Sequence, residues 1–156
     1  MATVWTDAGL EYMAQAFTDS SGLGGPPEAV EFRIGEGGWE TVAAVQVPKT
    51  PDPTRTTLDC QGPDVAIWVG LQSDFYFSVA LTPGVDVTRA GKVITAVARV
   101  ELADANDDGH GNDPEFWEAG LFLADGTMLA YSTFPRQIKN NTRILRHTFT
   151  LTLQRA

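Results

Sequence analysis

The sequence predicts a mainly β protein, an antiparallel β-sandwich with one N-terminal amphipathic helix. About seven segments alternate apolar and polar residues, which is the period of a β-strand. Residues that favour turns separate these segments, and a single stretch has the spacing of an amphipathic helix. Many short strands with turns between them, together with one helix to pack on a sheet, indicate a sandwich.

The length and composition predict a single domain over residues 1–156. A chain of 156 residues with 43% hydrophobic and 20% charged residues can bury its own core and is unlike a disordered segment. No apolar run is long enough to span a membrane and no signal pattern opens the chain, so we expect no membrane partner and synthesis in a cytoplasm. Cys60 is the only cysteine, which excludes an internal disulfide. We expect its thiol to be partly buried and unreactive.

The charge balance argues against a nucleic-acid partner. The chain carries 20 acidic and 11 basic residues, for a net charge of −9. Binding to a phosphate backbone needs a positive surface, which this composition does not provide.

The helix is predicted over residues 7–18. Thr6 is a good N-cap, and Asp7 suits the positive end of the helix dipole. A Ser-, Gly- and Pro-rich stretch at 20–27 must end the helix. Its apolar stripe, which we expect to pack on a sheet, consists of Leu10, Met13, Ala14 and Phe17.

Residues 115–135 are predicted to form the central hairpin of the fold. Alternation from Phe116 to Leu123 gives the first strand, and Asp125-Gly126 favours a tight turn. Apolar residues on both faces indicate that both sides of the hairpin are covered. Pro135 should end the second strand, because it cannot donate a ladder hydrogen bond. Further strands are expected at 30–34, 65–71, 75–81, 94–102 and 143–154, with a turn at 35–38 and an irregular loop at 48–53.

An acidic loop over residues 104–115 matches the calcium-loop pattern D-x-[DN]-x-[DN]-G-x5-E. Side-chain oxygens, one backbone carbonyl and a bidentate glutamate can surround one Ca²⁺. The flanking segments are predicted strands rather than helices, so the alternative is a turn-rich loop without metal. The candidate ligands are Asp104, Asn106, Asp108, the carbonyl of His110, Asn112 and Glu115.

Two other features bear on function. His147 lies on the apolar side of the last predicted strand, where a lone histidine is usually a hydrogen-bonded core residue. The second feature is a basic cluster, which is either a solvated surface or a contact for an acidic surface of a partner. That partner could be another copy of the chain. The cluster consists of Arg136, Lys139, Arg143 and Arg146. No nucleophile–base or paired-carboxylate arrangement is present, so we predict that the protein is not an enzyme.

A family resemblance is carried by the hairpin with the final strand that follows it, and by three other places in the chain. The hairpin contains the run EAGLFLADGTMLAYSTFP, and the last strand contains TFTLTL. Residues 6–10 read TDAGL, residues 32–37 read FRIGEG, and Lys139 precedes the last strand. Together these motifs resemble the family of bacteriophage tail-fibre and tail-collar attachment domains, in their opening helix, first strand and glycine turn, central hairpin and final lysine.

The resemblance implies a structural virion protein of a tailed bacteriophage. It would be an adaptor or attachment component of the tail, collar or baseplate that anchors fibres or neighbouring subunits. Its partners would be other copies of itself and other tail or baseplate proteins, and its location the virion, after assembly in the host cytoplasm. We expect self-association as a trimer or a ring.

A second hypothesis is a calcium-dependent β-sandwich module that binds a cell-surface glycan. Exposed aromatic rings can stack on sugars. The candidates for this role are Trp39, Trp68 and Tyr76.

Overall fold

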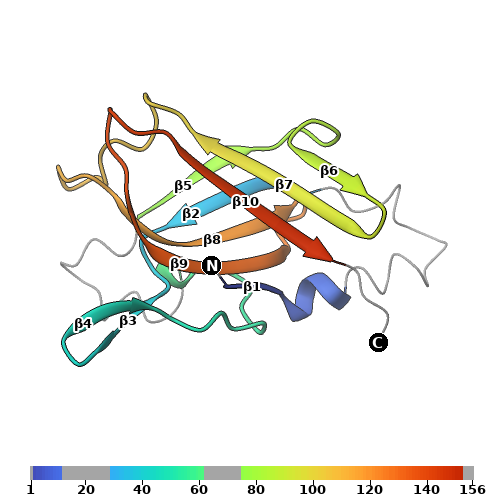
Figure 1. Cartoon of the computed structure of the whole chain (residues 1–156), viewed down its shortest axis with the longest axis horizontal. Coiled ribbons are helices and arrows are strands. Elements are labelled where there is room, and N and C mark those ends of the chain that lie inside the picture. The colour runs from blue at the N-terminus through green and yellow to red at the C-terminus, as the bar shows by residue number, and fades with distance from the viewer. Residues whose placement is uncertain (1, 12–28, 62–74, 153–156) are drawn as a thin grey trace.

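Two antiparallel sheets face each other, and a two-stranded arm projects beside them (Figure 1). The computed structural model describes residues 2–11, 29–61 and 75–152. The larger sheet has the order β1 (Ala2–Trp5), β9 (Met128–Ile138), β8 (Glu115–Leu123), β2 (Ala29–Gly35), β5 (Tyr76–Ala80). The smaller sheet has the order β10 (Leu145–Thr152), β7 (Val93–Val100), β6 (Val87–Ala90). The arm consists of β3 (Trp39–Val42) and β4 (Val45–Pro48). The predicted mainly β, antiparallel sandwich is confirmed.

The predicted hairpin is central, as the sequence indicated. Strands β8 and β9 pair with each other, β2 flanks β8, and β1 flanks β9. The turn closes with Leu123 N–H donating to the Thr127 carbonyl at 2.9 Å. Gly126 has φ +87°, a backbone conformation that suits glycine. Every β8 residue from Phe116 onward is buried, so both faces of this strand are covered.

The prediction that Pro135 ends the second strand is wrong, because β9 continues to Ile138. The pairing of β8 with β9 shifts register there: Glu118 lies opposite Thr133, and Phe116 lies opposite Gln137. Pro135 therefore falls in a bulge, where no ladder hydrogen bond is required of its nitrogen.

Two apolar clusters cover the two faces of the larger sheet. The first fills the space between the sheets and includes Phe32, Ile34, Ala96, Val100, Leu121, Phe149 and Leu151. The second lies on the opposite face and comprises Leu58, Cys60, Phe122, Met128 and Tyr131. Phe122 belongs to the second cluster because it alternates with Leu121 and Leu123 along β8. The segment that carries Leu58 and Cys60 includes a short 3₁₀ turn, η1 (Asp59–Gln61).

The N-terminal helix begins at Asp7, and its described part ends at residue 11. The Gly9 N–H donates to Thr6 Oγ1 at 3.0 Å, which confirms Thr6 as the N-cap. Leu10 is 50% exposed, although the predicted stripe places it on the sheet. At this turn Gly9 makes the close approach instead: a Cβ there would lie 2.5 Å from the Leu129 carbonyl oxygen. Residues 12–18 of the predicted helix lie outside the described residues.

Most of the other predicted strands are present, and the structure also has strands that the sequence did not predict. The predicted strands at 30–34, 75–81, 94–102 and 143–154 correspond to β2, β5, β7 and β10, and 35–38 forms the expected bend. The predicted strand at 65–71 lies outside the described residues. Strands β1, β3, β4 and β6 were not predicted. Among the described residues, no helix is long and apolar enough to cross a membrane.

Candidate functional site

The acidic loop joins β7 to β8, and most of its side chains bond to the backbone of the loop itself. Asp104 accepts from the Glu101 N–H, and Asp107 accepts from the Gly109 N–H. Asn112 donates weakly to the His110 carbonyl, at 3.4 Å. Glu115 faces Arg136, with both carboxylate oxygens 3.4 Å from Nη1. Within the described ranges, no three His, Cys, Asp or Glu side chains are grouped so that they could share a metal ion. Calcium binding therefore stays a prediction.

Asp108 is the one buried carboxylate of this loop, with 3% of its surface exposed. Its Oδ1 accepts from the backbone N–H groups of His110 and Asn112, at 2.7 and 3.2 Å. Its Oδ2 makes no hydrogen bond with any described residue. This oxygen is the best placed of the predicted ligands to take a cation, because a buried carboxylate oxygen without a partner is costly.

Lys139 already supplies a positive charge to the loop. It is fully buried, and its Nζ donates to Asn106 Oδ1 at 2.7 Å and to the Asn140 carbonyl at 2.9 Å. Desolvation lowers the pKa of Lys139, and the nearby Asp104 opposes that shift. The prediction that Lys139 contributes to a partner-binding surface needs correction, because its ammonium is turned inward to hold the loop.

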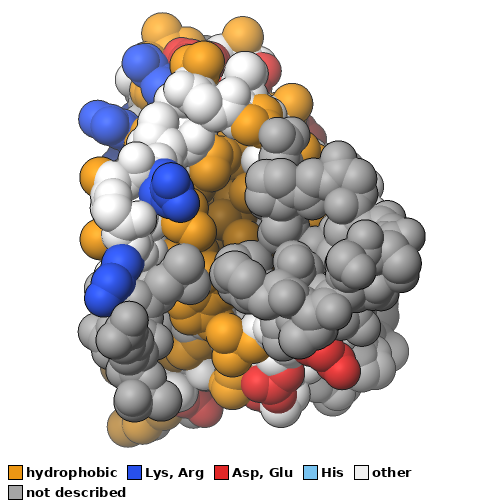
Figure 2. All heavy atoms as spheres, turned by 90° about the vertical axis from the view of Figure 1, so that its right-hand side faces the viewer, with side chains coloured by type: hydrophobic (Ala, Val, Ile, Leu, Met, Phe, Trp, Pro, Cys, Tyr) orange, Lys and Arg blue, Asp and Glu red, His pale blue; other side chains and the backbone are white. Residues whose placement is uncertain are grey.

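The other three residues of the predicted basic cluster, Arg136, Arg143 and Arg146, are exposed. Arg143 and Arg146 line a pocket between the two sheets, and Arg136 lies on the same strand as Gln137, which lines it too. Figure 2 views the molecule from the right-hand side of Figure 1. On the left of that view, Lys and Arg side chains lie next to exposed hydrophobic side chains. A partner contact through these three arginines stays a prediction; two of them, Arg143 and Arg146, lie at the pocket.

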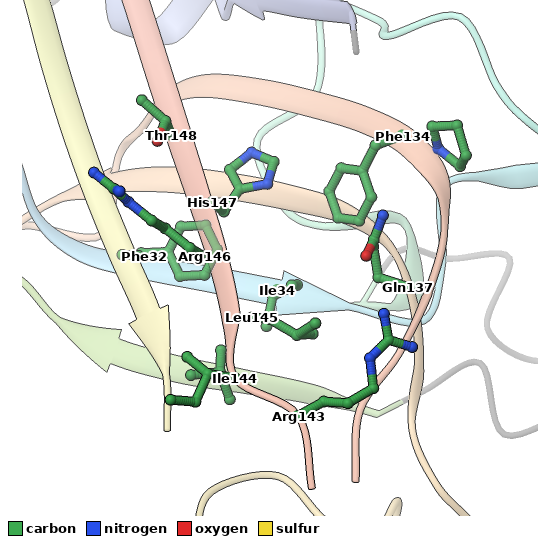
Figure 3. A pocket seen from close by; sticks show the side chains of 13 residues that line it. Phe32, Ile34, Phe134, Gln137, Arg143, Ile144, Leu145, Arg146, His147 and Thr148 are labelled. Carbon is green, nitrogen blue, oxygen red and sulfur yellow. The ribbon is translucent and has the colours of Figure 1, made fainter. Parts of the chain in front are cut away.

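The inter-sheet pocket has a volume of about 480 Å³ and lies between β9 and β10. This volume is within the range of roughly 300–1,000 Å³ that is usual for ligand sites. Figure 3 shows the rings of Phe134 and His147 pointing toward each other, with Arg143 and Gln137 together at one end. Its apolar lining includes Phe32, Ile34, Ala98, Val100, Phe134 and Leu145.

His147 faces this pocket from β10 and packs among aromatic rings. Its ring centroid lies 4.9 Å from that of Phe134, 5.0 Å from that of Phe149 and 5.5 Å from that of Phe32. Desolvation lowers the pKa of His147 to about 4, so its imidazole is neutral at pH 7. The prediction of an apolar-facing histidine is confirmed. The expected hydrogen bond is absent at Nε2, which has no partner among the described residues.

A buried carboxylate on β8 was not recognised in the sequence. Glu118 is fully buried and accepts three hydrogen bonds: from Asp59 N–H at 2.7 Å, Cys60 N–H at 2.9 Å and Tyr131 O–H at 2.6 Å. Desolvation raises the pKa of Glu118, while these three bonds favour its charged form. The carboxylate therefore fastens η1 to the outer face of the larger sheet.

A second buried carboxylate extends this network. Asp59 Oδ2 accepts from Lys49 Nζ at 2.7 Å and from the Gly38 N–H at 3.0 Å, and Oδ1 pairs with Arg55. Burial alone would raise the pKa of Asp59, but the bonds to Lys49 and Gly38 and the charge of Arg55 hold it below its usual value. Two carboxylates, two cations and the glycine bend thus form one polar layer, which we call the Glu118 network.

The network leaves Cys60 inert. The Cys60 thiol is buried beside Glu118, and burial raises its pKa well above the ordinary range. A thiol that stays protonated is a poor nucleophile, which agrees with the expected unreactive cysteine. Nothing in the sequence near Glu118 pointed to this cluster, because two of its three partners, Asp59 and Cys60, lie more than 50 residues away along the chain.

The aromatic residues proposed for sugar stacking differ in their surroundings. Trp39 is partly buried: its Nε1 donates to the Glu36 carbonyl at 2.9 Å, and its ring lies 6.3 Å from that of Trp117. Tyr76 is 39% exposed on β5, with the Arg33 guanidinium 5.9 Å from its ring centroid. Trp68 lies outside the described residues. Comparison with known protein families, curated proteins and solved structures finds no match.

Proposed function

We propose that this chain is a structural virion protein of a tailed bacteriophage, an adaptor or attachment component of its tail, collar or baseplate. The observation that carries the proposal is spatial. Besides the hairpin itself, three places that resemble tail-fibre and tail-collar attachment domains are far apart in the chain, yet they contact the β8–β9 hairpin or the residue that precedes it.

The contacts are specific at each place. The Thr6 N–H donates to the Leu129 carbonyl at 3.1 Å, so the start of the helix is anchored on β9. Residues of the FRIGEG segment pair with β8, from Phe32 opposite Leu121 to Gly35 opposite Glu118. The backbone N–H of Lys139 donates to the Pro114 carbonyl at 2.9 Å. A set of motifs that meet at one hairpin is what a shared structural core would require.

The chemistry of the described residues supports a structural role. The buried ionisable groups bond to backbone donors and to one another, and they hold segments together. The neutral His147 imidazole packs against the rings of Phe32, Phe134 and Phe149. We therefore propose an assembly function without catalysis, with Arg136, Arg143 and Arg146 as contacts for acidic surfaces of neighbouring subunits.

The proposal is tested by locating the protein in particles. Antibodies against the purified chain should label the tail, collar or baseplate of phage particles grown on the source host, seen by electron microscopy. Mass spectrometry of purified particles should recover the chain in a copy number set by tail symmetry. Its absence from purified particles would overturn the proposal.

The exposed Tyr76 keeps one alternative open for test, a calcium-dependent module that binds a surface glycan. Aromatic rings stack on sugar faces, and Arg33 beside Tyr76 can donate hydrogen bonds to hydroxyl groups. This function predicts binding on a glycan array that is lost with a chelator and with Tyr76→Ala. Binding that survives both changes would exclude this mode.

A further inference from the structure

The arm formed by β3 and β4 ends in an exposed apolar tip. Val42 and Val45 are 53% and 60% exposed, and Ala43 and Ala44 between them are exposed as well. Exposed hydrophobic side chains scattered singly are normal, but four consecutive ones at the end of a projecting hairpin are unusual. A continuous apolar tip suggests a surface that is covered in the working assembly.

Two alanines occupy the turn at this tip, although their backbone conformation is strained for a residue with a Cβ. Ala43 and Ala44 have φ values of +49° and +65°, the left-handed conformation of a two-residue hairpin turn. Asn-Gly or Gly-Gly would adopt this turn with less strain. Non-glycine residues in this region cost on the order of 1–2 kcal/mol each, and such strain is often found at functional sites. Alanines at this turn therefore indicate that the apolar character of the tip is used.

One face of the arm combines apolar side chains with an acid. Val42 lies directly opposite Val45, and Glu40 lies directly opposite Val47. Because paired residues point to the same side of a sheet, and residues two apart share a face, these four side chains form one surface. This face is apolar at its tip and negative one pair of residues further back.

The inter-sheet pocket has the complementary pattern. Its floor is apolar, with Phe32, Ile34 and Phe134, and its mouth carries the exposed Arg143 and Arg146. These arginines belong to the basic cluster of a chain whose net charge is −9. A segment with apolar side chains ahead of a carboxylate matches this arrangement in both polarity and charge.

We propose that the arm of one copy docks into the inter-sheet pocket of another copy. Val42 and Val45 enter the apolar floor, and Glu40 pairs with Arg143 or Arg146 at the mouth. Because the arm and the pocket are different surfaces, the contact is heterologous, and its repetition closes a ring or extends a filament. The contact does not depend on the tail assignment. Absence from phage particles would overturn only that assignment, and failure of the docking tests below would overturn only this contact.

Cysteine cross-linking of the full chain tests the contact directly. Ala44→Cys is placed at the arm tip, and Gln137→Cys is placed at the pocket mouth in a separate preparation. Mixed under mild oxidation, the two variants should form a mixed disulfide dimer. The native Cys60 is buried and does not compete. The matched control replaces Ala44→Cys by Val85→Cys, which lies outside the arm and is 72% exposed.

Docking predicts a mixed-dimer yield about tenfold or more above that of the control pair, because docking raises the local concentration of the two thiols. Equal yields from the two pairs would overturn the proposal. Neither Ala44→Cys alone nor Gln137→Cys alone should cross-link efficiently, since docking brings an arm to a pocket.

Sedimentation velocity over a range of concentrations provides the second test. Wild type should associate, and Val42→Ser with Val45→Ser should raise the dissociation constant by about a hundredfold. Val85→Ser should leave association unchanged. Glu40→Arg should weaken association, and mixing it with a chain carrying Arg143→Glu should restore part of it. A wild type that stays monomeric, or a double-serine variant that associates like wild type, would contradict arm docking.

Discussion

The Glu118 network and the acidic loop both place carboxylates next to β8. The two regions differ in where the hydrogen-bond donors to those carboxylates come from. Glu118 is fully buried and accepts hydrogen bonds from residues 58 and 59 positions away. In the loop, Asp107 and Asp108 accept from backbone groups within four residues. Glu118 takes two of its donors from a distant segment, whereas the loop carboxylates, including the buried Asp108, use nearby backbone. We therefore expect the network to stabilise the fold and the loop to respond to cations.

The largest predicted effect comes from removing the central carboxylate. Glu118→Ala leaves the N–H groups of Asp59 and Cys60 and the hydroxyl of Tyr131 without their acceptor. At about 1–3 kcal/mol for each of these three buried unsatisfied groups, the free energy of unfolding should fall by roughly 3–9 kcal/mol. Urea denaturation of wild type and Glu118→Ala measures this difference in unfolding free energy.

The matched control is Glu115→Ala, three residues away on the same strand. Glu115 pairs with Arg136 in an exposed salt bridge, so its loss should cost about 0–1 kcal/mol. Tyr131→Phe, which removes one of the three bonds to Glu118, should lie between the two. Similar losses for Glu118→Ala and Glu115→Ala would mean that the network does not hold the fold.

The next effect concerns His147, a partly buried residue that lies in neither region. Its folded-state pKa of about 4 is below the ordinary value of 6.5. Between pH 6.5 and pH 4 the unfolded chain binds a proton that the folded chain does not. The free energy of unfolding should therefore fall by about 3 kcal/mol as the pH is lowered through this window.

His147→Phe keeps a ring of similar size and removes the titration. The difference in unfolding free energy between wild type and this variant should change by that amount from pH 7 to pH 4. His110→Gln, in the acidic loop, serves as the control, because it removes a histidine and leaves His147 in place. A pH-independent difference for His147→Phe would show that the ring is solvated in the folded state.

Adding Ca²⁺ tests whether the acidic loop binds a cation. If Ca²⁺ binds the folded state alone, a hundredfold excess over the dissociation constant should raise the free energy of unfolding by about 2.7 kcal/mol. We expect weak binding, because Asn106 already accepts from Lys139 and must exchange that partner. Thermal melts in calcium and in chelator measure the shift.

The variant Asp104→Ala with Glu115→Gln should melt at the same temperature in both conditions, since it lacks the first and last ligands of the pattern. Identical melting of wild type in calcium and in chelator, together with no heat in a calorimetric titration, would leave the loop without a metal function.

The smallest predicted change in stability comes from substituting two glycines, Gly37 beside the Glu118 network and Gly111 in the acidic loop. A Cβ on Gly37 would lie 2.4 Å from the Cys60 nitrogen and 2.5 Å from Glu118 Oε1, whereas a Cβ on Gly111 meets nothing within 4 Å. Gly37→Ala should therefore destabilise by about 1–3 kcal/mol through overpacking. Gly111→Asn should cost less, because asparagine tolerates the positive φ of that position. Equal midpoints in urea would contradict the close packing at Gly37.

The sequence predicted the parts of the fold whose signals are local. Alternation and the Asp125-Gly126 turn located the central hairpin, and the Thr6 cap located the helix start. The arm was missed because its turn is Ala43-Ala44, which gives no turn signal. Pro135 misled the prediction, since a bulge that removes the need for its N–H depends on pairing between strands.

The candidate site was less predictable for the same reason. The acidic loop is contiguous, so its pattern could be read directly from the sequence. Glu118 reads as an ordinary polar residue of an alternating strand, and only folding places Asp59, Cys60 and Tyr131 around it. Lys139 was assigned to a surface cluster with three arginines, and only folding turns its ammonium to donate hydrogen bonds to Asn106 Oδ1 and the Asn140 carbonyl.

Hydrogen exchange of individual amides tests the central contrast most directly. The amides of Asp59 and Cys60 donate to a distant carboxylate inside the fold, whereas those of the exposed residues Gly109 and His110 donate to carboxylates two residues away in the same loop. The contrast predicts that the Asp59 and Cys60 amides exchange only with global unfolding, like those of β8, and that the loop amides exchange orders of magnitude faster. Fast exchange at Asp59 and Cys60, or equal protection in the two regions, would contradict it.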